Sequence, residues 1–170
     1  INCKRGLIIL MANPSFSELI KSPSLFLAFG FGSGLAPKAP GTFGSMAGLA
    51  IWLLLANLSL PAYLIVVTFS GLAGVYICGS AAEKLGVHDH GGIVWDEFVG
   101  LWIAMAALPV SWASIILGFG LFRFFDILKP WPISWIDKKV SGGLGIMLDD
   151  MVAGAAASAT IYMLASLGWI

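Results

Sequence analysis

The chain has 170 residues, of which 59% are hydrophobic and only 11% are charged, and its mean hydropathy is +0.94. A soluble domain of this length could not bury so much apolar surface in one core, so the composition indicates an integral membrane protein. The formal net charge is zero and no block of like charge is present, which excludes a nucleic-acid-binding protein.

The N-terminal part of the chain is expected to lie outside the membrane spans. The first methionine is Met11, so we expect residues 1–10 to be an extension and residues 11–170 to form a single membrane-embedded helical domain. From Pro14 to Phe31 polar and apolar residues alternate, with Pro23 among them. This pattern predicts a short helix that lies in the membrane interface.

Two antiparallel spans are predicted between Ala39 and Ala82, a stretch without any Asp, Glu, Lys or Arg. Its length is about twice what one helix needs to cross about 30 Å of hydrocarbon. The residues from Asn57 to Pro61 interrupt it with a turn pattern. The first span is therefore expected at Thr42 to Ala56 and the second at Ala62 to Ala82.

Three further spans are predicted in the second half of the chain. The stretch from Phe98 to Phe122 again lacks charged residues and has Leu108 to Ser111 at its centre, so two short spans fit if the flanking charged turns are included. Met147 to Gly168 predicts a fifth span, whose many Ala, Gly and Ser residues allow close helix packing. The expected fold is an all-α integral membrane bundle of about five spans plus an N-terminal interfacial helix.

Charged residues are concentrated in the connections on one side of this predicted bundle. Residues 57–61 and 108–111 carry none, whereas Lys38, residues 83–97 and residues 123–150 carry nearly all of them. Because successive spans alternate in direction, these charged segments should meet at one face of the membrane. Their lysines predict that this face is cytoplasmic.

Five carboxylates border apolar helices at that face: Asp96, Glu97, Asp126, Asp149 and Asp150. Unpaired charges are costly beside hydrocarbon, so a cluster of this size favours a functional site over five unrelated helix-end residues. Hard oxygen ligands without nearby thiols suit Mg²⁺ or Mn²⁺ rather than Zn²⁺. We expect all five to hold Mg²⁺, with Asp96, Glu97, Asp149 and Asp150 also acting in catalysis.

Asp126 lies between two basic residues, Arg123 and Lys129, at spacings of three. On a helix these three side chains would share one face. We expect the two bases to bind substrate phosphate, and the alternative is that Asp126 only neutralises Arg123.

A glycine-rich loop runs from Gly30 into a predicted helix start near Thr42. It is neither a Walker A sequence nor a dinucleotide fingerprint. Its backbone N–H groups together with Lys38, Thr42 and Ser45 could still bind a phosphate at a helix N-terminus. The alternative is a plain loop in which Thr42 or Ser45 is the N-cap.

The two histidines of the chain, His88 and His90, flank Asp89 in the predicted connection before Asp96. Either histidine could donate a proton during catalysis or ligate a metal, and the alternative is a solvated loop.

Four motifs resemble those of the bacterial phosphatidylglycerophosphatase A family. They are Pro37 to Ser45, His88 to Gly100, Phe122 to Ile133 and Gly142 to Asp150, in the family order. The similarity extends from about Leu25 to Gly154. It implies a Mg²⁺-dependent phosphatase of the bacterial inner membrane, with an all-helical core and an active site on the cytoplasmic face. The implied reaction converts phosphatidylglycerophosphate, held among membrane lipids, into phosphatidylglycerol and inorganic phosphate.

Two other functions use similar residues. A membrane transporter could carry cations or protons on the carboxylates, but the spans between the acids contain no charge that would continue such a route. A phospholipid-synthesising phosphotransferase also uses Mg²⁺ and aspartates, but its spaced Asp-Gly and Ala-Arg signature is absent. The oligomeric state is not indicated by any pattern in the sequence.

Overall fold

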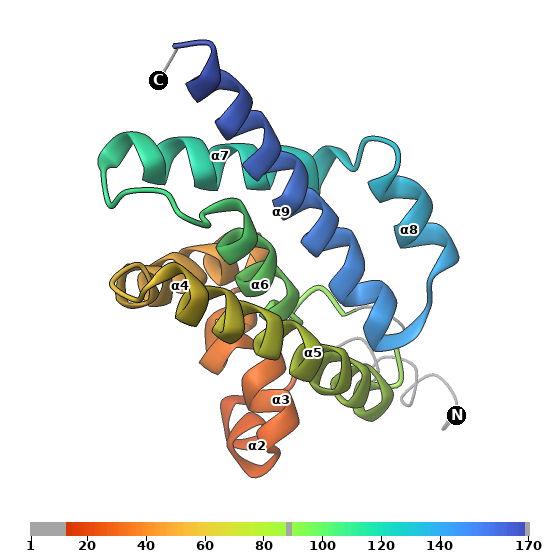
Figure 1. Ribbon diagram of the computed structural model, residues 1–170. Coiled ribbons are helices and arrows are strands. Elements are labelled where there is room, and N and C mark those ends of the chain that lie inside the picture. Colours follow the sequence, from red (N-terminus) through yellow and green to blue (C-terminus); the bar gives the residue numbers. More distant parts are fainter. Residues whose placement is uncertain (1–12, 88–89, 169–170) are drawn as a thin grey trace, which may run out of the picture.

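The computed structural model describes residues 13–87 and 90–168, and in these residues every regular element is a helix. Figure 1 shows the helices gathered into one bundle. In chain order the elements are α2 (Phe16–Lys21), α3 (Pro23–Ala28), the 3₁₀ helix η1 (Gly30–Leu35), α4 (Pro40–Leu55), α5 (Leu60–Leu85), α6 (Trp95–Ala104), α7 (Trp112–Leu128), α8 (Ile133–Lys139) and α9 (Gly142–Ser166). The predicted all-α class is confirmed.

Helix α6 is the centre of the bundle and contacts α4, α5, α7 and α9. Its side chains Phe98, Val99 and Leu101 are fully buried. Glycine permits the closest of these contacts, because a methyl group at Gly154 of α9 would overlap the backbone oxygen of Gly100. The small residues of α9 therefore bring its backbone against α6, as their composition predicts.

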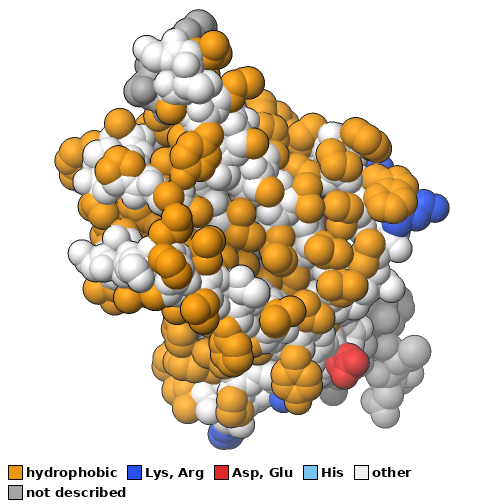
Figure 2. All heavy atoms as spheres, in the orientation of Figure 1, with side chains coloured by type: hydrophobic (Ala, Val, Ile, Leu, Met, Phe, Trp, Pro, Cys, Tyr) orange, Lys and Arg blue, Asp and Glu red, His pale blue; other side chains and the backbone are white. Residues whose placement is uncertain are grey.

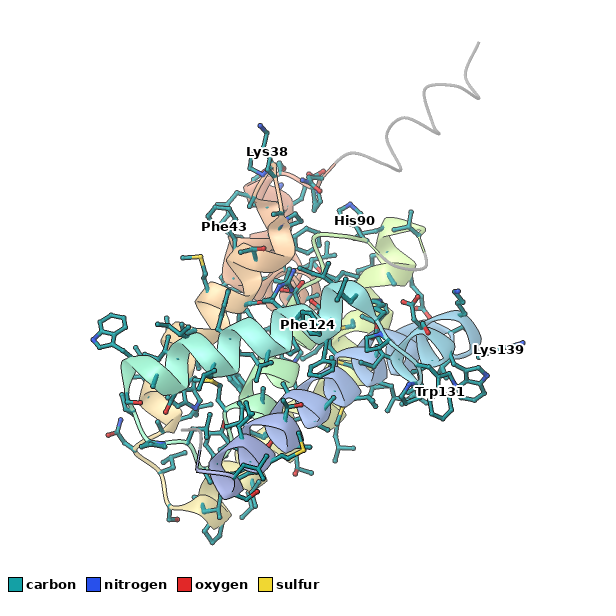
Figure 3. All side chains as sticks on the ribbon, turned by 90° about the horizontal axis from the view of Figure 1, so that it is seen from above. Lys38, Phe43, His90, Phe124, Trp131 and Lys139 are labelled. Carbon is teal, nitrogen blue, oxygen red and sulfur yellow. The ribbon has the colours of Figure 1, made fainter. Side chains whose placement is uncertain are left out.

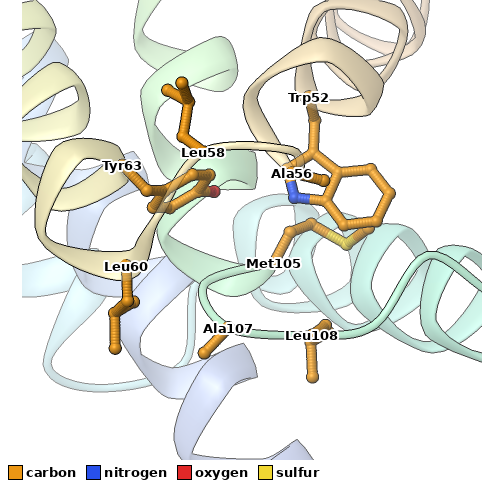
Figure 4. Close-up of a pocket in the computed structure, with 8 residues that line it drawn as sticks. All are labelled: Trp52, Ala56, Leu58, Leu60, Tyr63, Met105, Ala107 and Leu108. Carbon is orange, nitrogen blue, oxygen red and sulfur yellow. The ribbon is translucent and has the colours of Figure 1, made fainter.

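The two uncharged connections, between α4 and α5 and between α6 and α7, meet at one end of the bundle. There Tyr63 donates a hydrogen bond of 2.6 Å to the Trp102 carbonyl, and Tyr162 donates one of 2.7 Å to the Ala106 carbonyl. Figure 4 shows both uncharged connections beside one small cavity of about 70 Å³. Its lining residues are Trp52, Ala56, Leu58, Leu60, Tyr63, Met105, Ala107 and Leu108.

Two helices of the described residues, α5 and α9, are long and apolar enough to cross a membrane. Helix α4 is apolar but has only 16 residues, and α6 has only 10 residues. At 1.5 Å per residue α6 reaches about 15 Å, half of the hydrocarbon thickness, so α6 alone is not a span. The five predicted segments are thus helical, while the number that cross the membrane stays a prediction.

The surface of the bundle is strongly apolar. On α5 the side chains of Ile65, Phe69 and Leu72 are about 70% exposed, at 69%, 71% and 71%. Figure 2 shows hydrophobic side chains covering most of one face, with charged groups only at its margins. Contiguous apolar surface of this kind suits contact with lipid rather than water.

The N-terminal segment forms two short helices and a 3₁₀ turn in place of the single predicted helix. Helix α2 begins with a capping box, in which the Ser15 backbone N–H donates to Glu18 Oε2 at 2.7 Å. Helix α3 begins separately at Pro23, because proline lacks the N–H that would continue α2. Lys84 at the end of α5 donates to the Ser22 and Ser24 hydroxyls at 2.8 Å, which attaches this segment to the charged end.

Candidate active site

Arg123 near the end of α7 links three helices at the charged end of the bundle. Its Nη1 lies 3.5 Å from Glu97 Oε1 in the first turn of α6, forms an ion pair with Asp126, and donates to Ser45 Oγ of α4 at 3.3 Å. The Ser45 hydroxyl donates to Glu97 Oε2 at 3.1 Å. The predicted pairing of Arg123 with Asp126 on one helical face is confirmed, and tertiary packing adds Glu97 and Ser45.

The first turns of α4 lie directly against the Glu97 carboxylate. A methyl group at Gly41 would overlap Glu97 Oε1, and one at Gly44 would come within 2.8 Å of Oε2. The N-cap of α4 is Ala39, in the left-handed conformation at φ 49°. The alternative of Thr42 or Ser45 as N-cap is therefore wrong, because the helix begins before both residues at Pro40. The glycines instead allow a helix N-terminus, with its partial positive charge, to approach a carboxylate.

Lys129 forms a second link, between α8 and α9. Its Nζ lies 2.6 Å from Asp137 Oδ1 and 2.6 Å from Asp149 Oδ2. The expected alignment of Lys129 with Asp126 on one helical face is wrong, because Lys129 is the C-cap of α7 at φ 41° and leaves the helical register. Asp137 was not predicted as a site residue, and only its place directly before the exposed Lys138 and Lys139 could have suggested a role.

Asp96 and Asp150 complete the acidic cluster, and both are buried, at 9% and 4% exposed. Four other acids lie close enough to Asp150 for their negative charges to repel the charge of its carboxylate. These acids are Asp96, Glu97, Asp126 and Asp149. The five predicted carboxylates therefore gather at one end of the bundle, on three helices.

The electrostatics of this cluster leave negative charge unbalanced. Glu97 lies outside the two candidate spans, and burial raises its pKa to about 7 even though the nearby Arg123 opposes the shift. For Lys129, burial alone would lower the pKa, but the hydrogen bonds to Asp137 and Asp149 outweigh it and raise the pKa. In the part of the chain that the structure describes, two basic residues thus face six acids, so a further cation would stabilise the ionised cluster.

Two buried polar atoms in the cluster have no hydrogen-bond partner among the described residues. One is an acceptor, Asp149 Oδ1, and the other is a donor, Arg123 Nε. Buried polar atoms without a partner cost free energy, and such atoms at a functional site are commonly completed by a ligand. An oxygen acceptor fits a cation, and a guanidinium donor fits a phosphate oxygen.

The oxygen donors of the cluster meet part of the coordination that Mg²⁺ needs. Within the described residues no three His, Cys, Asp or Glu side chains form a ready-made metal-binding group. Mg²⁺ commonly uses only one or two carboxylates and completes its octahedron with waters and substrate phosphate. The hard oxygen donors, the excess negative charge and the Asp149 oxygen therefore fit Mg²⁺, although a complete set of protein ligands is not preformed.

Not every predicted site residue joins the cluster. Lys38 is exposed and projects away from the bundle, and Thr42 lies in the first turn of α4 with its N–H bonded to the Ala39 carbonyl. His90 packs against Phe29 with ring centroids 5.5 Å apart, and its Nδ1 accepts from the Gly92 N–H at 3.0 Å. In neutral His90 the proton is then on Nε2. The predicted role of His88 lies outside the described residues, as does Asp89.

Comparisons with known proteins match this chain to one family. The family model described as phosphatidylglycerophosphatase A matches residues 26–165. The chain is 48% identical over 146 residues to phosphatidylglycerophosphatase A of Escherichia coli strain K12, covering 85% of each chain. It is 47% identical over 152 residues to the protein of that name from Haemophilus influenzae, covering 88% of this chain and 93% of the relative.

A more distant relative carries a different name. The chain is 34% identical over 155 residues to a protein of Bacteroides thetaiotaomicron named as a candidate phosphatidylinositol-3-phosphatase, covering 85% of this chain and 91% of the relative. No solved structure matches the chain. The matched region contains α4 to α8, nearly all of α9, and every residue of the acidic cluster.

Proposed function

The chain belongs to the phosphatidylglycerophosphatase A family, and on this basis we propose that it removes the terminal phosphate of phosphatidylglycerophosphate. It is a phosphatase, and the products would be phosphatidylglycerol and inorganic phosphate. The observation that carries the proposal is the convergence of carboxylates from α6, α7 and α9 with the two basic side chains Arg123 and Lys129 at the end of α7, inside the family-matched region.

The proposed phosphate-binding groups are Arg123, Lys129 and the Ser45 hydroxyl. Arg123 keeps the buried Nε donor for a phosphate oxygen, and its planar guanidinium suits a forked contact. Lys129 has three N–H donors, of which two serve Asp137 and Asp149. Lys38, which is exposed, and Thr42, in the first turn of α4, lie outside this set of groups and would contact only the outer part of the substrate headgroup.

The proposed cofactor is Mg²⁺, held by Asp149, Asp150, Asp96 and Glu97, with Asp126 balancing Arg123 beside it. When bound, Mg²⁺ would supply positive charge for the phosphoryl oxygens and the attacking water. Arg123 and Lys129 would stabilise the charge that spreads over the transferred phosphoryl group. The buried carboxylates would orient the attacking water through hydrogen bonds and accept its proton.

The departing glycerol oxygen also needs a proton. His90 and His88 are the proposed donors, because a histidine can change its charge near neutral pH. Neutral His90 would carry its proton on Nε2, because its Nδ1 accepts a hydrogen bond from the Gly92 N–H. Exchange of His90 for Gln should therefore lower kcat more than it raises KM.

The proposed location is the bacterial inner membrane, in a multi-pass arrangement with the acidic cluster at the cytoplasmic face. The apolar surface of α5 supports contact with lipid, and Lys84, Lys138 and Lys139 all belong to the charged end. In this arrangement the lipid tails would remain in the bilayer while the headgroup reaches Arg123 and Lys129.

Transport of cations or protons is the competing function. No acidic or basic residue occurs in residues 50–82, 98–122 or 151–168, which make up the uncharged half of the bundle. A transport route would need polar groups across the whole bilayer. The confinement of the acids to one end therefore favours hydrolysis at the membrane surface.

Phosphate release by the purified protein in detergent tests the proposal. Phosphatidylglycerophosphate should release inorganic phosphate, and phosphatidylinositol 3-phosphate serves as the comparison substrate because one relative carries that name. Failure to release phosphate from phosphatidylglycerophosphate, with a folded protein and Mg²⁺ present, would contradict it. If labelled phosphate is trapped on an aspartate, the reaction proceeds through an aspartyl-phosphate intermediate and not by direct attack of water.

A further inference from the structure

Lys129 joins two carboxylates that differ in their surroundings. Its Nζ lies 2.6 Å from both Asp137 Oδ1 and Asp149 Oδ2. The Asp137 side chain is 35% exposed and the Asp149 side chain only 9%. The ammonium group therefore lies between an outer acid on α8 and an inner acid of the buried cluster.

The position of Asp137 is set by the packing of α8 and not by contacts within the acidic cluster. Helix α8 packs against α9, and its residue Ile133 is only 2% exposed. Lys129 ends α7 in the left-handed conformation, just before Pro130. Asp137 therefore lies on a helix that is fixed by packing. Its ion pair restricts the Lys129 side chain, which could otherwise adopt many rotamers.

The charges explain why a second acid matters. If Asp149 were the sole carboxylate partner, the Lys129 ammonium would be drawn fully onto that buried group and would be less available to another anion. With Asp137 as a second partner, the ammonium is attracted to two carboxylates rather than to Asp149 alone. Two of its three N–H groups donate to these carboxylates, and the third can donate to another anion.

We propose that Asp137 is a positioning residue that holds the Lys129 ammonium at the edge of the acidic cluster, where it binds the terminal phosphate of the substrate. On arrival of the phosphate, the third N–H of the Lys129 ammonium donates to a phosphate oxygen, while Asp137 keeps the ammonium in place. This inference rests on the proposed function, since it assigns a role in binding the phosphate that is to be removed.

Exchange of Asp137 for Asn tests the proposal, because the amide keeps the shape and removes the charge. KM for phosphatidylglycerophosphate should rise about tenfold while kcat stays within about twofold, the pattern of lost ground-state binding. Binding of inorganic phosphate, measured by calorimetry on the Mg²⁺-loaded protein, should weaken by a similar factor. The Asp137→Glu variant retains the charge and should restore both values to within about threefold.

Two further variants separate positioning from a general effect. Glu83→Gln removes another exposed carboxylate, near the end of α5, and should leave KM and phosphate binding unchanged. In a Lys129→Gln background, Asp137→Asn should have no additional effect on KM, because Asp137 acts through Lys129.

Several results would overturn the inference. These are an unchanged KM in Asp137→Asn, equal loss of kcat and kcat/KM, failure of Asp137→Glu to restore binding, or additive effects of the Lys129 and Asp137 changes. Wild-type protein that binds inorganic phosphate without hydrolysing phosphatidylglycerophosphate would contradict the proposed function instead. In that case the calorimetric comparison of wild type with Asp137→Asn still decides whether Asp137 positions Lys129.

Discussion

Gly41 in the first turn of α4 lies so close to Glu97 in the first turn of α6 that a methyl group on it would overlap Glu97 Oε1. The same methyl group would approach Nη2 of Arg123 to 3.2 Å. The absence of a side chain at position 41 therefore allows a carboxylate and a guanidinium from two other helices to meet beside a helix N-terminus.

Gly41→Ala should disturb the site without unfolding the bundle. The new methyl group must displace Glu97 and Arg123, so we expect kcat/KM for phosphatidylglycerophosphate to fall at least about tenfold, as misplaced catalytic groups commonly produce. Steady-state phosphate release measures the effect. Gly120→Ala on α7 is the matched control, because nothing lies within 4 Å of the added methyl group. Equal activity in both variants would show that the position of Glu97 is unimportant.

Asp150→Asn should separate activity from stability. Asp150 is 4% exposed and its charge is repelled by four neighbouring acids, so a neutral amide removes a costly buried charge. We expect phosphate release to fall at least about 100-fold while Tm in detergent stays equal or rises. Asp96→Asn should lower activity in the same way. Full activity in either variant would remove that residue from the site.

Removal of Mg²⁺ should abolish turnover reversibly. The cluster has more acids than bases and a buried oxygen of Asp149 without a partner among the described residues, so the chelated protein should lose nearly all phosphate release. Added Mg²⁺ should restore the rate and should also raise Tm, because the ion binds only the folded cluster. Chelator already saturated with Mg²⁺ is the control. Undiminished turnover in excess chelator would exclude a role for the metal.

Glu97 should make the metal-free protein less stable as pH rises. Its pKa is raised by burial from 4.5 to about 7, so the folded state retains a proton that the unfolded state loses first. The stability associated with this group is present below about pH 4.5 and is lost as pH approaches 7, by up to about 3 kcal/mol. Thermal unfolding of wild type and Glu97→Gln between pH 5 and 8 should therefore show a smaller decline in the variant. Parallel declines in Tm would contradict this assignment.

Much of the architecture was accessible from the sequence. Long runs without charged residues predict helices, and the alternation of such runs predicts that the charged connections meet at one end. The pairing of Arg123 with Asp126 also follows from a local spacing of three on one helix. These features depend on the order of residues within a segment, which is why they can be read before the fold is known.

The lengths of the helices were less accessible. Helix α6 ends at Ala104, and Ala107 adopts a left-handed conformation, so the apolar run from Phe98 to Phe122 divides into a short helix and a longer one. Apolar composition does not distinguish a segment that faces lipid from one buried among other helices. Phe98 and Leu101 are fully buried, so the apolar side chains of α6 pack against other helices in the core of the bundle.

By itself, the sequence determined the helical class, the apolar surface and the collection of acids at one end, because the long uncharged runs and the charged segments between them are visible in the order of the residues. Only the tertiary structure decided that Arg123 meets Glu97 and Ser45, and that Lys129 turns from Asp126 to Asp137 and Asp149. Such partners depend on helix packing distances, which are set here by glycines whose missing side chains permit contact.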